Sequence, residues 1–173
     1  MLAWFSRPRA ALGAAVLVAI AVAGCQPSAE QQVKDAFRRE FRENGRRVAF
    51  FYAQFMAAPT KPVGPNGFSG PKDEAELRAF IADSPTSALE DMGIKSAAAP
   101  ELFASERDGR PFLVRYGIKG PLTPYFVLRE AQGVNGRVRV FRTDGASVEV
   151  AIDEAEAYMT GKHDAAHDPG PAI

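Results

Sequence analysis

The sequence predicts an α+β fold, with a long N-terminal amphipathic helix and short helices packed on a C-terminal antiparallel sheet of about four strands. Two patterns support this prediction. Apolar residues recur with the helical period of about 3.6 residues early in the chain, and they alternate with a period of about two after residue 110. Helical segments followed by a run of strands are typical of α+β domains.

The long helix is predicted over residues 29–56. Its apolar side chains lie within an arc of about 100°, the width of a helix face docked on a core: Val33, Phe37, Phe41, Val48, Phe51, Tyr52 and Phe55. Asn44 and Gly45 interrupt the pattern, and a glycine costs about 1 kcal/mol in a helix interior. They mark either a bend or a boundary between two helices. We expect one bent helix, because the apolar phase continues across them.

A loop and several short helical segments follow. Residues 58–72 contain four prolines and three glycines, so we expect an irregular loop that is either mobile or functional. Asp73 is placed to cap one helix, and Ser84, followed by a proline, to cap the next. Gly93 is a helix stop signal, and a short turn of helix is predicted at 100–103.

Four strands are predicted from the alternating pattern, at residues 112–118, 125–131, 137–143 and 147–152. Short turns at 133–136 and 144–145 link the last three as hairpins, and a short helix is expected over 153–160. The predicted core joins the helix face to the sheet through Phe37, Phe41, Val48, Phe51, Phe55, Val114, Tyr116, Phe126, Leu128, Val138, Val140, Val148 and Val150.

The one cysteine of the chain directly follows an apolar run. Arg7 and Arg9 precede this run, and twenty uncharged residues separate Arg9 from Glu30, which is the outline of a secretory signal. Residues 22–24 are Val-Ala-Gly, and Cys25 comes next. This segment resembles the lipobox of bacterial lipoprotein precursors, in which an aliphatic residue and small residues precede the cysteine.

The resemblance implies that the Cys25 sulfur receives a diacylglyceryl group, that residues 1–24 are removed and that the new amine is usually acylated. Two or three acyl chains hold a protein at a bilayer durably, whereas one gives marginal binding. Gln26 stands where many inner-membrane lipoproteins have aspartate, which favours the periplasmic face of an outer membrane. The alternative is an uncleaved apolar helix, because about 20 residues just span a bilayer.

The expected organisation follows from this signal. Residues 25–29 form a lipidated tether, 30–161 a single α+β domain, and 162–173 a disordered tail. Export implies an oxidising compartment, but a chain whose one cysteine is alkylated forms no disulfide. Removal of the signal takes away two arginines and lowers the net charge from zero to minus two, which argues against a nucleic-acid partner.

Side chains suited to catalysis are scarce in the sequence. His163 and His167 lie in the predicted tail, where weak metal binding or none is expected, and residues 30–161 contain neither histidine nor cysteine. Nucleophile–histidine pairs are therefore excluded from that segment, and we predict no catalysis, no metal and no cofactor. The alternative is a small envelope enzyme that uses carboxylates, for which the candidates flank the strands: Glu101, Glu106, Asp108, Asp153, Glu154 and Glu156.

Two surfaces are candidates for contact with partners. Phe68 is predicted to be exposed among polar neighbours in the 58–72 loop, and loops on rigid scaffolds often carry recognition. Arg38, Arg42 and Arg46 form a basic stripe opposite the apolar face of the long helix, close in sequence to the lipid, where anionic headgroups would attract them. The alternative is an ordinary solvated face with acidic residues interspersed.

A further resemblance concerns the globular part. A long helix followed by a small antiparallel sheet, with Asp108 to Phe112 reading D-G-R-P-F before the first strand, is similar to pseudopilin-type domains. This resemblance implies an accessory of a secretion or filament system, which we keep as an alternative. The sequence favours a lipid-anchored, non-catalytic interaction or scaffold module at the cell envelope, with an envelope protein as a possible partner.

Overall fold

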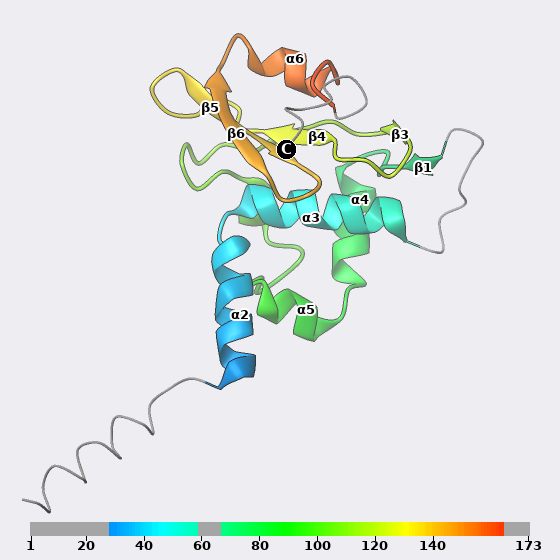
Figure 1. Cartoon of the computed structure of the whole chain (residues 1–173), viewed down its shortest axis with the longest axis vertical. Helices are drawn as coiled ribbons and strands as arrows, with labels where there is room; N and C mark the ends of the chain where they lie inside the picture. The colour runs from blue at the N-terminus through cyan, green and yellow to red at the C-terminus, as the bar shows by residue number, and fades with distance from the viewer. Residues whose placement is uncertain (1–27, 59–66, 165–173) are drawn as a thin grey trace, which may run out of the picture. The chain divides into compact units, whose positions relative to one another are not determined.

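The computed structural model describes residues 28–58 and 67–164 (Figure 1). Cys25, the predicted lipidation site, lies outside these residues, and so does His167. The side chain of Phe37, which the sequence assigned to the core, is also outside the description. The predictions made for these positions therefore stay predictions.

The described part combines helices with antiparallel sheets, as the sequence predicted. The chain divides into two units, residues 1–36 and residues 37–173. The sheets belong to the second unit, and so do the side chains whose contacts are described below. Within the described ranges, no helix combines the length and the apolar character needed to cross a membrane.

Two helices replace the single long helix that the sequence predicted. Helix α2 (Ala29–Glu40) ends before a short break, and helix α3 (Asn44–Ala57) begins after it. The backbone N–H of Asn44 donates to Glu106 Oε1 at 2.7 Å, which satisfies one of the open donors at the start of α3. Gly45 is buried, and a Cβ there would lie 2.4 Å from Phe141 Cζ. Asn44 and Gly45 therefore mark a helix start that fits closely against the sheet.

The short helices lie close to their predicted positions: α4 (Glu74–Ala82), α5 (Thr86–Asp91) and the 3-10 helix η1 (Pro100–Phe103). Asp73 caps α4 as predicted, because its Oδ1 accepts the Glu76 N–H at 2.8 Å. Ser84 does not cap α5. Its hydroxyl donates to the carbonyl of Phe80 at 3.2 Å, and Pro85 occupies the capping position. Gly93 ends this region with φ at +70°, as a helix stop requires.

The main sheet has four antiparallel strands in the order β2-β4-β5-β6: β2 (Leu113–Val114), β4 (Phe126–Arg129), β5 (Arg137–Arg142) and β6 (Ser147–Ala151). Asn135 and Gly136 both have positive φ, 54° and 72°, which is the type I′ geometry of a tight hairpin. Helix α6 (Ala155–Met159) follows β6, as predicted. The C-terminal meander is thus confirmed.

A second, two-stranded sheet was not predicted. Strand β1 (Phe68–Ser69) pairs antiparallel with β3 (Lys119–Gly120). The predicted strand 112–118 is consequently cut to β2, because Gly117 takes a φ of +69° and turns the chain. The predicted loop is also ordered at its end, where the Gly70 N–H donates to the Ile118 carbonyl at 2.8 Å.

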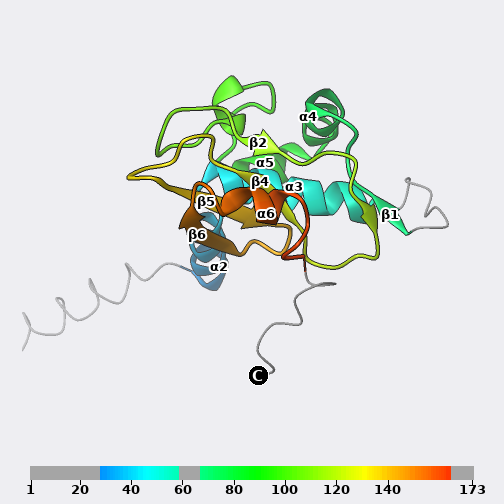
Figure 2. The same cartoon turned by 90° about the horizontal axis from the view of Figure 1, so that it is seen from above.

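Apolar side chains cover both faces of the main sheet. One face packs against α3 through residues that include Phe51, Phe55, Leu128 and Phe141. The other face packs against α6 through Phe126, Val138, Val140, Val150 and Ala155. Figure 1 shows α3 and α6 on opposite sides of the strands, and Figure 2, seen from above, shows α6 in front with α3 behind. Apart from Phe141 and Ala155, the sequence predicted these residues as core, but it joined all of them to the face of the long helix. Phe126, Val138, Val140 and Val150 instead lie on the opposite side of the sheet, against α6.

Some predicted core residues are less buried than expected. Val148 is 36% exposed, because it lies on the edge strand β6 while α6 packs mainly over β4 and β5. Phe41, Val114 and Tyr116 are only partly buried, although each packs against the core.

The folded part extends beyond the predicted boundary at residue 161. Asp164 is only 4% exposed, and its Oδ2 accepts from Arg115 Nη1 at 2.6 Å while its Oδ1 accepts the Phe126 N–H at 3.0 Å. His163 stacks on Tyr158 with ring centroids 4.2 Å apart. These residues, which the sequence assigned to the disordered tail, therefore belong to the fold.

Candidate functional site

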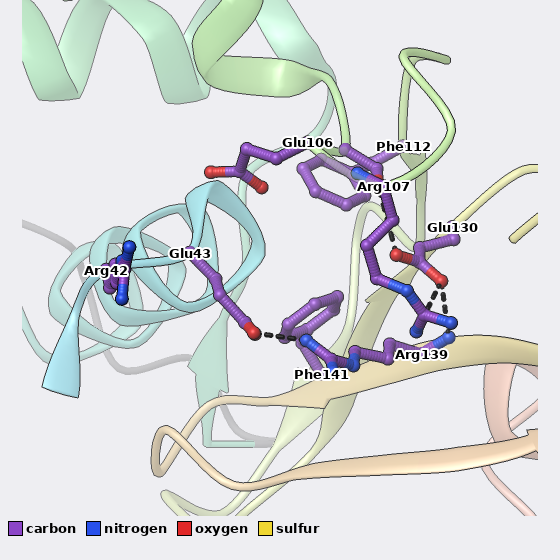
Figure 3. A pocket seen from close by; sticks show the side chains of 9 residues that line it. Arg42, Glu43, Glu106, Arg107, Phe112, Glu130, Arg139 and Phe141 are labelled. Carbon is purple, nitrogen blue, oxygen red and sulfur yellow. Dashed lines mark hydrogen bonds and ion pairs between the residues drawn. The ribbon is translucent and has the colours of Figure 1, made fainter. Parts of the chain in front are cut away.

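A cavity of about 410 Å³ lies between the start of α3, the loop before β2 and the main sheet (Figure 3). Its walls carry three arginines, three glutamates, two phenylalanines and a serine: Arg42, Glu43, Ser105, Glu106, Arg107, Phe112, Glu130, Arg139 and Phe141. The volume is near the lower end of the range for small-molecule pockets. Because charged side chains of both signs line it, we take this cavity as the candidate site in the described part of the chain.

Glu130 forms the floor of this cavity and is only 1% exposed. Its Oε1 accepts from the Ser105 hydroxyl at 2.9 Å, and its Oε2 accepts the backbone N–H of Arg139 at 2.9 Å. Arg107 Nη1 completes the set, 3.2 Å from Oε2. A buried carboxylate needs such partners, because an unpaired charge is costly to remove from water. Glu130 is thus fully engaged by its neighbours.

The ion pairs extend from Glu130 to the edge of the sheet and to α3. Arg107 Nη1 also lies 3.0 Å from Glu149 Oε2, and Arg139 Nε lies 3.7 Å from the same oxygen. Arg139 Nη1 pairs in addition with Glu43 Oε1, and Figure 3 shows its side chain reaching from β5 toward the start of α3. The network therefore ties the first turn of α3 to the sheet.

The remaining pocket carboxylate, Glu106, also has a structural partner. It accepts the Asn44 N–H, and the Asn44 amide donates to the carbonyls of Glu101 and Ala104 at 2.8 and 3.1 Å. The second oxygen of Glu43 is buried without a hydrogen bond, although Arg46 Nε lies 3.8 Å away. Each of the three glutamates thus holds a cation or a backbone donor. This arrangement suits a structural network better than an acid/base pair poised to exchange protons.

The structure revises the position of Phe68. We expected this side chain to be exposed among polar neighbours in the 58–72 loop, but it is half-buried in β1 and packs against the main core. The pairing of β1 with β3 holds it there. Phe68 is accordingly a poor candidate for contact with a partner.

The three arginines of the predicted basic stripe differ in their surroundings. Arg46 lies within 3.9 Å of Glu40 and 3.8 Å of Glu43, and it donates to the Ser147 hydroxyl at 3.4 Å. Arg38 and Arg42 are exposed. Among the residues that the structure describes, neither has an acidic or carbonyl partner. Within the described ranges, the stripe therefore keeps two guanidinium groups without such a partner, those of Arg38 and Arg42.

Sequence reasoning missed Glu130, Arg139 and Arg107. A signal for the first was present, since Glu130 lies two residues after Leu128, which the sequence had assigned to the core. Alternate residues of a strand point to the same face, so this parity marks an acidic side chain directed inward. No comparable local signal marks Arg107.

Asp108, one of the carboxylates singled out in the sequence, fixes a turn. Burial would raise its pKa, but hydrogen bonds from the backbone N–H groups of Arg110, Gly133 and Gln132 outweigh burial and hold the pKa below its ordinary value. A depressed folded-state pKa stabilises the fold above the unfolded value of about 3.9 and loses that contribution as the pH falls through the folded value.

Substitution Asp108→Ala is therefore expected to destabilise the protein by a constant amount between about pH 7 and pH 5, and by less as the pH falls below about 4. Urea denaturation of the unsubstituted protein and the variant across this range measures the difference. A difference that stays constant to the lowest pH at which both proteins fold would contradict the role of the charged form.

No cluster of three potential metal ligands occurs in residues 28–58 and 67–164. Comparison with known proteins gives no family model, no curated protein and no solved structure that matches this chain.

Proposed function

We propose that the chain is a lipid-anchored protein of the cell envelope that acts as a non-catalytic interaction or scaffold module. The anchor is Cys25, at the end of the Val-Ala-Gly-Cys segment that resembles a lipobox. The favoured destination is the periplasmic face of an outer membrane, on the basis of Gln26. The location is proposed from this sequence signal, and the non-catalytic role is proposed from the side chains that line the cavity.

The observation that carries the non-catalytic role is the engagement of the pocket glutamates. A general acid or base must exchange a proton with a substrate, so at least one of its oxygens has to be open to the reacting group. Among the described residues, Glu130 has both oxygens engaged, by Ser105, Arg107 and Arg139, so this buried carboxylate has no oxygen left for a substrate. Glu106 uses one oxygen to accept the Asn44 N–H at the start of α3. These groups support the fold of the pocket walls.

A small envelope enzyme that uses carboxylates is the second candidate. The observation that favours it is Glu43 Oε2, an acceptor without a hydrogen bond that lines the cavity. Complementation of a deletion strain with variants of the protein separates the two roles. The substitution Glu43→Gln keeps the shape of the side chain, so a module retains function with this variant, whereas an enzyme that uses the Glu43 charge loses it.

Lipidation is tested by the mass of the protein in membrane extracts. The mature chain is expected to begin at Cys25, with a mass increased by a diacylglyceryl group and usually one further acyl chain. The substitution Cys25→Ser is expected to abolish this increase and to move the protein out of the detergent phase, because two or three acyl chains supply the durable attachment. A mature chain that begins elsewhere, or an unmodified thiol, would show that the lipobox assignment is wrong.

A partner is tested by photocrosslinking in intact envelopes. A crosslinking residue at position 42, at the mouth of the cavity, is expected to capture an envelope protein more strongly than one at position 119, an exposed site on β3. Equal capture at both positions would argue against a binding surface at the cavity.

A further inference from the structure

Apart from Arg39, which also has an interaction partner, the arginines of the described part fall into two groups. In the first group, each guanidinium contacts a carboxylate, a carbonyl or a side-chain amide: Arg46, Arg47, Arg78, Arg107, Arg115, Arg129, Arg137, Arg139 and Arg142. In the second group, within the ranges described, are Arg38, Arg42 and Arg110, which are exposed and have no such partner. Two of these three unpaired guanidinium groups lie only four positions apart.

Arg42 is separated from the cations of the ion-pair network. Figure 3 shows it across the cavity from Arg107, on the side of the α3 start. Glu43 follows Arg42 in the sequence, but its carboxylate pairs with Arg139. Glu43 therefore does not neutralise the charge of Arg42. The positive charge of Arg42 is consequently left to solvent or to a ligand outside the protein.

The position of Arg38 and Arg42 in the chain brings them near the proposed anchor. The four residue steps from Cys25 to Ala29 span at most about 14 Å when fully extended. The 12 residues of α2 add about 18 Å along its axis. The two arginines thus remain within a few tens of ångströms of the acyl chains, a distance that lets them reach the headgroup layer.

We propose that Arg38 and Arg42 bind the phosphate groups of anionic lipids and form a second attachment beside the lipid anchor. Guanidinium is suited to this ligand, because its planar set of donors matches the oxygens of a phosphate in a bidentate way. The attraction decays within about 8 Å at physiological salt, so it acts only when the arginines are held at the surface. This inference rests on the proposed lipidated location, which supplies that proximity.

The test uses the mature chain, residues 25–173, with Cys25→Ser, so that no acyl chain contributes to binding. Sedimentation with phosphatidylcholine vesicles, with and without phosphatidylglycerol, measures partitioning. The double variant Arg38→Gln/Arg42→Gln is compared with Arg110→Gln/Lys119→Gln. The control removes two exposed cations that have no partner among the described residues, so both double variants carry the same net charge.

The Cys25→Ser chain that keeps all its arginines is expected to bind anionic vesicles and not neutral ones. The Arg38/Arg42 variant is expected to bind about 25-fold more weakly, from roughly fivefold for each arginine at an anionic surface, and the control double variant is expected to lose much less. Equal losses in the two variants would overturn the assignment, and so would a lack of preference for phosphatidylglycerol. Circular dichroism of each variant verifies the fold.

These results are independent of the lipidation test. A chain that carries no lipid at Cys25 but prefers anionic vesicles would overturn the anchor alone. A lipidated chain whose Cys25→Ser form ignores phosphatidylglycerol would overturn only the role of the arginines.

Discussion

The substitution Glu130→Ala is expected to destabilise the protein by about 3–5 kcal/mol, the cost of breaking a buried ion pair by removing one partner. The carboxylate is 1% exposed, and its loss leaves the Ser105 hydroxyl and the Arg139 N–H without their acceptor. It also leaves Arg107, whose side chain is 23% exposed, with only the solvent-facing Glu149. Urea denaturation at neutral pH measures the change.

Two controls show whether the cost arises from the buried charge. Glu149→Gln removes a more exposed partner of the same arginine, with 39% of its side chain accessible, so it is expected to cost less than about 1 kcal/mol. Replacing both Arg107 and Glu130 by methionine is expected to cost less than Glu130→Met alone, since the double change leaves no unpaired charge. A Glu130→Ala cost as small as that of Glu149→Gln would show that the network does not stabilise the fold.

The substitution Phe51→Ala is expected to cost a similar amount, about 3–5 kcal/mol, as is usual for a phenylalanine removed from a well-packed core. Its side chain is 3% exposed and lies in the cluster between α3 and the sheet. It also contacts Phe50 edge to face, with ring centroids 5.7 Å apart. Thermal or urea denaturation measures the loss.

The control for Phe51 is Leu122→Ala, since Leu122 is 53% exposed and a surface change usually stays within about 0.5 kcal/mol. If Phe51→Ala changed the stability as little as Leu122→Ala does, the assignment of α3 to the core would be wrong.

The sequence predicted the strands of the meander well because their signals are local. The strands β5 and β6 lie within the predicted ranges, and each ends within one residue of the expected end. Alternation sets the faces, and Asn135-Gly136 sets a hairpin whose geometry depends on those two residues alone. The capping of α4 by Asp73 is local in the same way.

The features that were missed depend on residues distant in sequence. The start of α3 is fixed by Glu106 and by the ring of Phe141, neither of which is visible in the periodicity of residues 29–56. The β1–β3 pair joins segments about fifty residues apart, and each strand has only two residues. Alternation over two residues gives no signal, so the pair could not be predicted.

The same distinction applies to the candidate site. The Val-Ala-Gly-Cys segment that resembles a lipobox is contiguous, so the sequence is sufficient to propose lipidation there. The cavity gathers Glu43, Ser105, Glu130 and Arg139 from four separate segments, and only folding brings them together. The inward parity of Glu130 indicates a buried acid, but it does not indicate which bases neutralise it.

The order of elements along the chain also affects how the protein is made. Phe51 of α3 and Phe141 of β5 lie in one cluster but are about ninety residues apart, so translation at about 5–20 residues per second separates their synthesis by roughly 5–20 s. During that interval the apolar face of α3 has no sheet to cover it, so it is exposed to water or bound by a chaperone. Folding of this core is therefore delayed until the C-terminal strands have been synthesised.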